Sequence, residues 1–305
     1  MNLGTEICGI PLASPVLNGS GTYDALAAQR AFGEALEREF PFAAFVSKTI
    51  TLEPRAGNPP PRLYETAGGV INSIGLPNPG LEGFLAGDLN RLVELPVPLI
   101  VSVMASSAEH FIELVEGVSA VEGVAGIELN VSCPNVHSGL IVGEQPDETL
   151  ALMDKLRPRT SLPLIVKLTP NVANPDRIAV AAEEGGADAV SLINTVKAAG
   201  IDPNHNRTWL GVGAGGLSGP AVRPIALAQT RTVSSAVQIP VIGMGGITDG
   251  ESALEFILAG ATVIAVGTEN FRDPAAGNAV RDGLGAALAR RGFDSLAAAQ
   301  TSTLS

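Results

Sequence analysis

The chain has 305 residues, of which 46% are hydrophobic and 16% charged, with 35 glycines and 22 prolines. This length suits one large domain or two average ones, and α/β barrels often reach it as a single unit. The formal net charge of −12 and an aromatic content of 4% argue against nucleic-acid and anionic-membrane partners, which would meet net repulsion and few rings for base stacking.

The few cysteines and histidines limit what the chain can hold by itself. Cys8 and Cys133 are far apart in the sequence, so a disulfide scaffold is not expected, and an iron–sulfur cluster needs about four thiolates. The three histidines show no metal-ligand spacing, so no metal site is predicted. No signal-peptide pattern is present and no apolar run reaches the ~20 residues that span a bilayer. We therefore expect a cytoplasmic protein without a membrane partner.

The first part of the chain predicts five segments. In order, they are a short hairpin over 3–13, a buried strand over 15–18, a helix over about 24–37, a buried strand over 43–48 and a long excursion over 53–80. The helix is predicted from apolar residues at helical spacing, which are Ala28, Phe32, Ala35 and Leu36. The excursion is too rich in proline, glycine and asparagine for a helix, and it should lie on the same face as Lys48.

From residue 99 onward, strands and helices alternate regularly. Strands are predicted at 99–104, 127–132, 164–169, 189–194, 240–244 and 263–267. Ser106 and Glu109 have capping-box spacing, and an apolar stripe through Leu114 predicts the helix behind them. Further helices are predicted near 147–157, 175–184 and 220–235 and around Leu254 and Leu284, with a second glycine-rich excursion over 196–219.

These elements together indicate the fold. Strands that are apolar on both sides are typical of a parallel sheet covered by helices. Eight strand–helix units in about 300 residues favour a closed α/β barrel, the (β/α)8 or TIM barrel, over an open doubly wound sheet. The barrel should carry a short N-terminal hairpin and long loops on its C-terminal face. No linker-like composition interrupts the units, so residues 1–305 are expected to form one domain.

The strand over 127–132 runs into a polar segment that contains Cys133 and Pro134. Pro134 lacks a backbone donor and biases the residue before it toward extended geometry, so Cys133 should lie where the strand opens into a loop. In a parallel barrel that is the C-terminal face, whose loops carry the chemistry. A free cysteine is often only a small buried hydrophobe, but the polar neighbours and the loop favour a functional thiol.

Other polar residues gather at the same ends of the strands. Solvent-facing strand ends are often polar, but this explains poorly why lysines and asparagines end otherwise apolar strands, always on one side. Amides can both donate and accept, which suits a flat heterocycle with alternating carbonyl and N–H groups. The residues are Asn18, Ser20, Lys48, Ser102, Asn130, Ser132, Lys167, Asn194 and Thr195.

Glycines follow the last two predicted strands. Gly245, Gly246 and Gly267 let the backbone approach a ligand and point N–H groups at it. The loops after the seventh and eighth strands are the usual phosphate site of such barrels. The two glycine sites together predict a cofactor or substrate that carries a phosphate group.

With these motifs in this order, the sequence resembles class 1 dihydroorotate dehydrogenases, the FMN-containing enzymes of pyrimidine biosynthesis, over nearly its whole length. The segments that carry the resemblance are 47–49, 57–62, 72–80, 130–135, 193–195, 216–220 and 242–246. The Gly-Leu-Ser-Gly-Pro segment at 216–220 and Glu65-Thr66 resemble the NAD-linked class 1B more than the fumarate-using class 1A. The membrane-bound class 2 enzymes use serine where this chain has Cys133.

The resemblance implies a role for each matching position. Cys133 is implied as the general base. The implied substrate contacts are Lys48, Asn72, Ser73, Ile74, Gly75, Leu76, Asn130, Asn194 and Thr195. The implied FMN contacts are Ser20, Lys48, Thr49, Ser102, Asn130, Lys167, Ile193, Gly219, Gly245, Gly246, Gly267 and Thr268. The family usually has asparagine where this chain has Ser102, and serine is shorter and has no amide.

The resemblance also implies one FMN per chain, dihydroorotate as substrate, orotate as product and a homodimer of this chain. FAD and a [2Fe–2S] cluster are expected only on a partner subunit that passes electrons to NAD, because this chain has no Gly-x-Gly-x-x-Gly fingerprint after a strand. The residues suit this chemistry. A thiol with an ordinary pKa of about 8.5 can take the proton when hydride leaves, and Lys167 can offset negative charge on the reduced flavin.

Three alternatives remain open. The first is a flavoprotein of the dihydropyrimidine dehydrogenase type, whose loop after the cysteine differs from 135–139 and which comes with cluster-binding cysteines that this chain lacks. The second is a fumarate-using class 1A enzyme. The third is a catalytically silent FMN-binding subunit, against which the presence of Cys133 and Lys48 argues.

Overall fold

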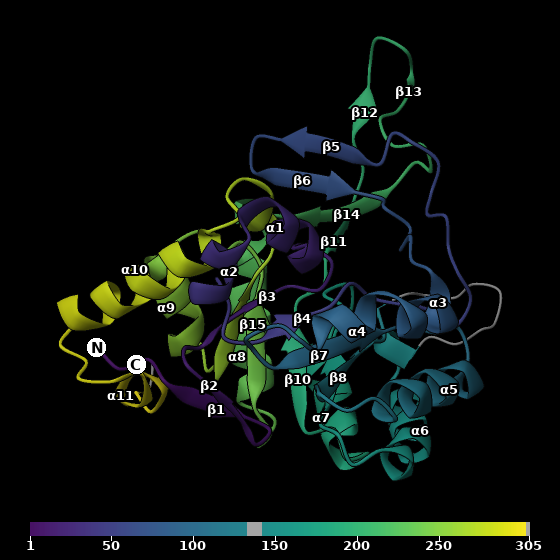
Figure 1. The fold of residues 1–305 in the computed structure, drawn as a ribbon. Helices are drawn as coiled ribbons and strands as arrows, with labels where there is room; N and C mark the ends of the chain where they lie inside the picture. The colour runs from purple at the N-terminus through teal and green to yellow at the C-terminus, as the bar shows by residue number, and fades with distance from the viewer. Residues whose placement is uncertain (133–141, 303–305) are drawn as a thin grey trace.

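The computed structural model describes residues 1–132 and 142–302, and it places all eight predicted strands in one parallel sheet (Figure 1). The sheet order is β4-β7-β8-β9-β10-β15-β16-β3. Seven strands follow the chain order, and β3, the first barrel strand, lies next to the last one, β16, as in a closed ring. This order confirms the (β/α)8 barrel. The strands are β3 (Val16–Asn18), β4 (Phe45–Val46), β7 (Leu99–Val103), β8 (Val124–Asn130), β9 (Leu164–Lys167), β10 (Ala189–Leu192), β15 (Val241–Met244) and β16 (Val263–Val266).

The barrel closes between β3 and β4 with the help of one side chain. The backbone N–H of Ala43 donates to the carbonyl of Val16 at 2.8 Å. The side chain of Asn18, which is fully buried, donates to the carbonyl of Val46 and accepts from the N–H of Val46, both at 2.8 Å. This amide therefore pairs with the neighbouring backbone as a strand residue would, so Asn18 serves the closure of the barrel.

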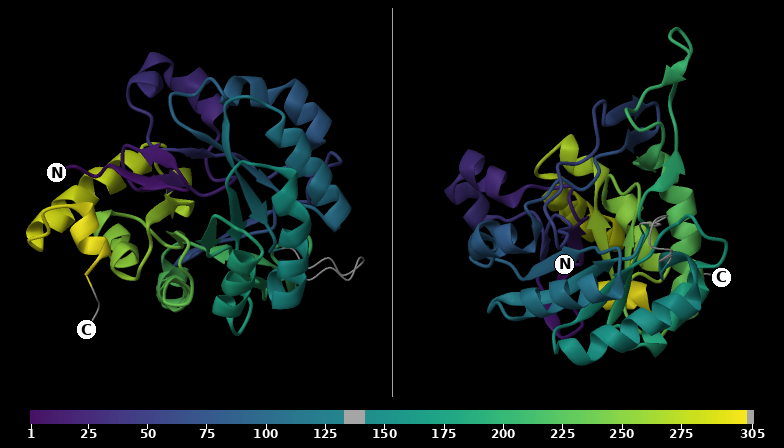
Figure 2. Two further views of the ribbon diagram at one scale, coloured as in Figure 1. Left: turned by 90° about the horizontal axis from the view of Figure 1, so that it is seen from below. Right: turned by 90° about the vertical axis from the view of Figure 1, so that its right-hand side faces the viewer.

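Helices surround the strands on the outside, as the view from below shows (Figure 2, left). Those that match predictions are α5 (Ala108–Ser119), α6 (Pro146–Leu156), α7 (Pro175–Glu184), α8 (Arg223–Ser234), α9 (Gly250–Leu258) and α10 (Ala276–Arg290). Those that were not predicted are α3 (Gly80–Ala86), α4 (Asp88–Leu92), α11 (Leu296–Gln300) and the 3₁₀ turns η1 (Val142–Glu144), η2 (Arg157–Arg159), η3 (Pro220–Val222) and η4 (Thr268–Phe271). No helix within the described ranges is long and apolar enough to cross a membrane.

Two helix predictions need correction. The single helix expected over 24–37 is two, α1 (Ala25–Phe32) and α2 (Glu34–Arg38), because Gly33 breaks it with a φ of 54°. The break turns the two halves of the predicted apolar face in different directions, so Leu36 is buried whereas Phe32 is 51% exposed. At α5 the cap is Ser107, whose hydroxyl accepts from the N–H of His110, so the box expected from Ser106 does not form.

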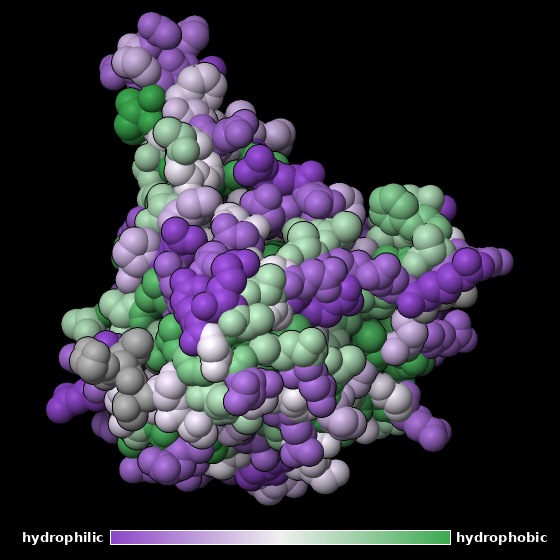
Figure 3. Space-filling model, turned by 90° about the vertical axis from the view of Figure 1, so that its left-hand side faces the viewer, coloured by the Kyte–Doolittle hydropathy of each residue, from purple (hydrophilic) through white to green (hydrophobic). Residues whose placement is uncertain are grey.

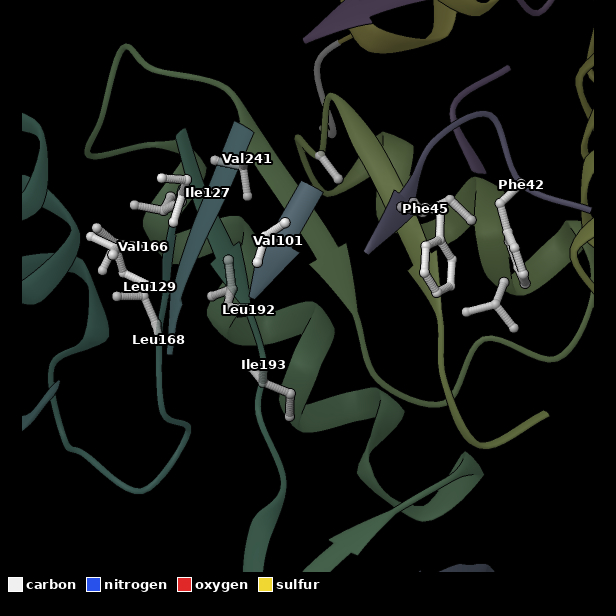
Figure 4. Close-up of a cluster of buried hydrophobic side chains, with 14 of the residues drawn as sticks. Phe42, Phe45, Val101, Ile127, Leu129, Val166, Leu168, Leu192, Ile193 and Val241 are labelled. Carbon is white, nitrogen blue, oxygen red and sulfur yellow. The ribbon is translucent and has the colours of Figure 1, made fainter. Parts of the chain in front are cut away.

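Apolar side chains fill both sides of the barrel wall. Strand residues such as Val101, Ile127 and Val166 share a buried cluster with residues of the surrounding helices, and Figure 4 shows part of this cluster. Alternate residues point inward, where Leu17, Ile100, Ile165 and Ile242 meet the N-terminal hairpin. The predicted hairpin is confirmed as β1 (Thr5–Ile7) and β2 (Ile10–Leu12), and its apolar residues plug the N-terminal end of the barrel.

The two long excursions build a second sheet above the barrel. Strands β5 (Leu63–Thr66) and β6 (Gly69–Asn72) come from the first excursion, and β11 (Val196–Ala198) and β14 (Gly215–Ser218) come from the second. They form an antiparallel sheet in the order β11-β14-β6-β5. Beyond it, β12 (Ile201–Asp202) and β13 (Arg207–Thr208) form a projecting arm whose tip is mostly hydrophilic (Figures 1 and 3). The excursions were expected as loops, so this sheet is a correction.

Candidate active site at the C-terminal face

A polar layer crosses the barrel interior above the apolar plug. Ser102, Glu128, Lys167 and Ser191 all point inward, and none of them is more than 5% exposed. Ser102, Lys167 and Ser191 each follow an inward apolar residue by two positions along their strand, so all three face the same interior. The polar layer marks the depth at which the barrel changes from a packed core to a site.

The Glu128 carboxylate is the centre of this layer, and the sequence analysis did not single it out. Its Oε1 accepts a hydrogen bond from Ser102 Oγ at 2.9 Å, and its Oε2 accepts one from Ser191 Oγ at 3.3 Å. Ser102 Oγ also lies 2.9 Å from Thr49 Oγ1. The serine that replaces the usual asparagine thus faces this carboxylate inside the barrel. The available signal was a charged residue at an inward position of an apolar strand, which is rare without a partner.

Two lysines predicted from strand ends meet at this layer. Lys167 Nζ donates to Ser20 Oγ at 2.8 Å and lies 3.7 Å from Glu128 Oε1. Lys48 is largely buried, and burial lowers its pKa, with a further decrease from the positive charge of Lys167. An added Cβ on Gly21 would lie 2.9 Å from Lys48 Nζ, so the lysine reaches the loop that follows β3. Ser20, Lys48 and Lys167 therefore lie at one place, as predicted.

The two amides predicted to bind a ring system also meet. Asn194 Nδ2 donates to Asn130 Oδ1 at 3.3 Å, and the N–H of Thr195 donates to Asn194 Oδ1 at 2.8 Å. Ser132, the last described residue before the predicted base, donates its N–H to Asn130 Oδ1 and its hydroxyl to the carbonyl of Lys167. The ends of β8, β9 and β10 are thereby joined into one polar surface at the mouth of the barrel.

The predicted substrate loop lies against this mouth through the second sheet. Asn72 Nδ2 donates to the carbonyl of Gly216 at 3.3 Å, and an added Cβ on Gly216 would collide with Thr195 Oγ1. Asn58 also fixes the loop, because its side chain donates to Ser73 Oγ at 2.9 Å and its N–H donates to the carbonyl of Ile74 at 3.0 Å. The loop is therefore fixed on both sides.

The left-handed backbone of Gly75 and Leu76 ends this loop. Gly75 has a φ of 78° and Leu76 a φ of 54°. An added Cβ on Gly75 would lie 2.5 Å from the backbone nitrogen of Asn58, so only glycine fits there. This close approach brings residues 72–76, which were predicted as a unit, into one fixed turn.

The glycines predicted for a phosphate form a cradle. Gly219 and Gly246 have φ values of 97° and 78°, and an added Cβ on Gly246 would lie 2.8 Å from the carbonyl oxygen of Gly219. Thr268 Oγ1 donates to Ser218 Oγ at 2.8 Å, next to Gly219. Gly267 lies beside Gly19, where an added Cβ would be 3.6 Å from the Gly267 Cα. These close approaches bring the backbone segments after β14, β15 and β16 together, and backbone amides at such a place suit the phosphate end of a flavin nucleotide.

Gly245 differs from its neighbour in this cradle. An added Cβ there would lie 2.8 Å from the Cβ of Ala226 in α8 and 3.2 Å from the side chain of Ile193. Gly245 thus allows α8 and the end of β10 to pack closely, whereas an added Cβ on Gly246 would meet the Gly219 carbonyl oxygen and the Cβ of Arg223, at the start of α8, each at 2.8 Å. The structure brings both residues to the predicted place, but it gives them different surroundings.

The predicted base, Cys133, lies outside the described residues. Among residues 1–132 and 142–302 no group of three histidine, cysteine, aspartate or glutamate side chains is placed to hold a metal ion. The roles assigned to single residues, including the FMN contact of Ser102, stay predictions.

Comparisons with known proteins point to one enzyme family. A family model described as dihydroorotate dehydrogenase matches residues 2–288. A protein of Desulforudis audaxviator named dihydroorotate dehydrogenase B (NAD(+)), catalytic subunit, is 47% identical over 291 residues, which cover 94% of this chain and 92% of that protein. A protein of Caldicellulosiruptor saccharolyticus with the same name is 42% identical over 300 residues, 97% of each chain. A Solibacter usitatus protein, provisionally named dihydroorotate dehydrogenase A (fumarate), is 44% identical over 295 residues, 95% of each chain.

Proposed function

Because the chain belongs to the dihydroorotate dehydrogenase family, we propose that it is the FMN-dependent catalytic subunit of an NAD-linked dihydroorotate dehydrogenase. It would oxidise dihydroorotate to orotate in the biosynthesis of pyrimidines. The observation that carries the proposal is the meeting, at one face of the barrel, of a glycine cradle suited to phosphate and of two lysines and two amides suited to an anionic heterocycle.

The residues of the site divide into two groups in this proposal. Gly219, Gly246, Gly267 and Thr268 would hold the phosphate end of one FMN through backbone amides and a hydroxyl, with residues 1–305 acting as one unit. Lys167, with Ser20, would lie at the flavin ring, where its ammonium group favours negative charge. FMN, when bound, supplies the acceptor for the hydride that leaves the substrate.

The remaining residues would act on the substrate. Lys48 offers a positive charge for the carboxylate of dihydroorotate, and the amides of Asn130 and Asn194 can pair with its ring carbonyl and N–H groups. The Cys133 thiolate takes the proton from one ring carbon as hydride leaves the neighbouring carbon. The substrate thus loses two electrons and two hydrogens, one as a proton and one as hydride, and becomes orotate.

NAD is the final acceptor that we favour over fumarate. Relatives named as NAD-linked catalytic subunits are 42% and 47% identical to the chain, and its Gly-Leu-Ser-Gly-Pro and Glu65-Thr66 segments resemble class 1B. We propose that a partner subunit with FAD and a [2Fe–2S] cluster carries the electrons onward, and that the chain forms a homodimer. The provisional fumarate-linked relative keeps class 1A as the second candidate.

The isolated chain tests this proposal. Purified chain should contain FMN and should couple dihydroorotate oxidation to an artificial dye, but it should barely reduce NAD until the partner subunit is added. Rapid use of fumarate by the isolated chain would instead support the class 1A candidate. Failure to retain FMN, or failure to oxidise dihydroorotate with any acceptor, would count against both.

A further inference from the structure

Glu128 is the buried charge that the proposed mechanism does not use. Its side chain is 4% exposed, and it lies on the inner wall of the barrel below the mouth. A buried carboxylate is costly unless it is hydrogen-bonded and paired with a positive charge. Here two hydroxyls donate hydrogen bonds to the carboxylate, and one ammonium group lies 3.7 Å from it.

We propose that Glu128 is a positioning residue that keeps Lys167 charged and aimed at the flavin ring. The inference rests on the proposed function, because it concerns the FMN that Lys167 would meet. In this arrangement, hydrogen bonds from Ser102 and Ser191 hold the Glu128 carboxylate in place. The carboxylate in turn holds the Lys167 ammonium group.

The Glu128–Lys167 ion pair is oriented along the barrel axis. Asn130, which lies at the mouth, is in register with Lys167 on the neighbouring strand, and Glu128 lies two residues below Asn130 on the same face of β8. Lys167 extends from that level to Ser20 in the loop after β3. The carboxylate is thus the deeper end of the pair and the ammonium group the outer end. A flavin at the mouth meets the positive end.

The charge balance shows why the carboxylate is needed. Glu128 Oε1, from β8, lies 3.7 Å from Lys167 Nζ, and the positive charge of Lys167 lowers the pKa of Lys48, from the segment after β4. The two ammonium groups repel each other, and burial disfavours the charge of Lys48 further. With Glu128 removed, two half-buried or buried ammonium groups would share one site without a counter-ion. Loss of this counter-ion would disfavour the double positive charge of the site.

The experiment compares four reconstituted holoproteins across about pH 6 to 10, a range that ends near the ordinary pKa of lysine. They are the wild type, Glu128→Gln, the double variant Glu128→Gln/Lys167→Met, and the control Glu116→Gln. The control makes the same substitution in the exposed ion pair between Glu116 and Arg159. The quantity measured is the ratio of affinities for reduced and oxidised FMN, obtained from the midpoint potential of the bound flavin.

The expected result is a pH-dependent departure from the wild type, compared at the same pH, that appears only in Glu128→Gln. At low pH its preference for reduced FMN should equal or exceed that of the wild type, because Lys167 keeps its charge without an opposing carboxylate. As the pH rises, the preference should fall about tenfold below the wild type, which is ~30 mV for a two-electron couple, and join the double variant. The control should follow the wild type at every pH.

Two outcomes would overturn the inference. One is a Glu128→Gln profile that stays parallel to the wild type over the whole range. The other comes from urea unfolding of the apoproteins, for which Lys167→Met is added as a fifth protein. Removal of a compensating pair should restore stability relative to either single change, so a double variant less stable than both Glu128→Gln and Lys167→Met would overturn the inference. This second measurement needs no flavin, so it also decides the matter if Glu128→Gln fails to bind FMN. A wild type that binds no FMN would contradict the proposed function instead.

Discussion

Lys48 carries its charge into a site that already holds Lys167, and this shapes the pH dependence of ligand binding. Its pKa lies below the ordinary 10.5, first because it is buried and second because Lys167 repels its proton. Orotate and dihydroorotate carry a carboxylate, so their binding favours charged Lys48. Binding should therefore be strong below the pKa of Lys48 in the free protein and should weaken as the pH rises through it.

Orotate binding followed by flavin absorbance tests this dependence. Lys48→Met should bind orotate at least about tenfold more weakly at neutral pH, because a charged hydrogen bond is lost. The variant should also lose the part of the alkaline profile that belongs to Lys48, which the wild type shows below pH 10.5. Parallel profiles for the two proteins would show that Lys48 does not bind the carboxylate.

Cys133 and Cys8 provide a matched pair for testing the base. Cys133→Ser should keep its FMN but slow flavin reduction by dihydroorotate by roughly 10²–10⁴-fold, the usual contribution of a general base. Cys8→Ser should react as fast as the wild type, because Cys8 lies in the hairpin turn at the opposite end and burial raises its thiol pKa to about 12. Stopped-flow mixing without oxygen measures both. Equal rates in all three proteins would exclude Cys133 as the base.

Single site residues were predictable where a charged or amide side chain interrupts the apolar pattern of a strand. Lys48, Lys167, Asn130 and Asn194 end apolar strands on one side, and the structure brings them together. Glu128 was missed because only three-dimensional pairing shows that a buried carboxylate has partners. Partners that come from separate strands cannot be read from one local segment.

At the scale of the element, the glycine loop after β15 gives a sharp test. Gly246→Ala would place a Cβ 2.8 Å from the carbonyl of Gly219 in a residue with φ of 78°. The cradle must then open, so FMN affinity should fall by about tenfold or more. Gly9→Ala is the control, because Gly9 has the same φ of 78° but open space around it. The control should lose only the stability that a left-handed alanine costs, ~1–2 kcal/mol.

Fluorescence titration of the apoproteins with FMN, together with urea unfolding, separates these effects. Unchanged FMN affinity in Gly246→Ala would contradict the assignment of the cradle. A loss of affinity in Gly9→Ala as large as that in Gly246→Ala would also contradict it, since backbone strain alone would then explain both.

Elements were predictable in proportion to their regularity. The barrel strands and the helices from α5 to α10 follow strong apolar periods, and all of the strands are found. The second sheet was missed because its strands have only three or four residues each, and β6 pairs with β14 across a long sequence separation. The helix expected over 24–37 failed for a local reason, since Gly33 turns the chain between Phe32 and Glu34.

In the whole molecule, the residues that stabilise the fold and the residues of the candidate site lie at different levels along the barrel axis. The hairpin and the inward apolar residues close one end, the polar layer around Glu128 lies above them, and the excursion sheet frames the other end (Figures 1 and 2). The hairpin, the polar layer and the excursion sheet follow one another in this order because the strands are parallel and all begin at the plugged end. This is why polar strand ends in the sequence were enough to predict the active face.

An anaerobic titration of the purified, yellow chain with dihydroorotate tests the central claim most directly. Each molecule of dihydroorotate should bleach one bound FMN and yield one orotate, whereas dihydrouracil, which lacks the carboxylate that Lys48 would bind, should leave the flavin oxidised. A chain that holds no FMN, or a flavin that dihydrouracil bleaches as readily as dihydroorotate does, would contradict the assignment.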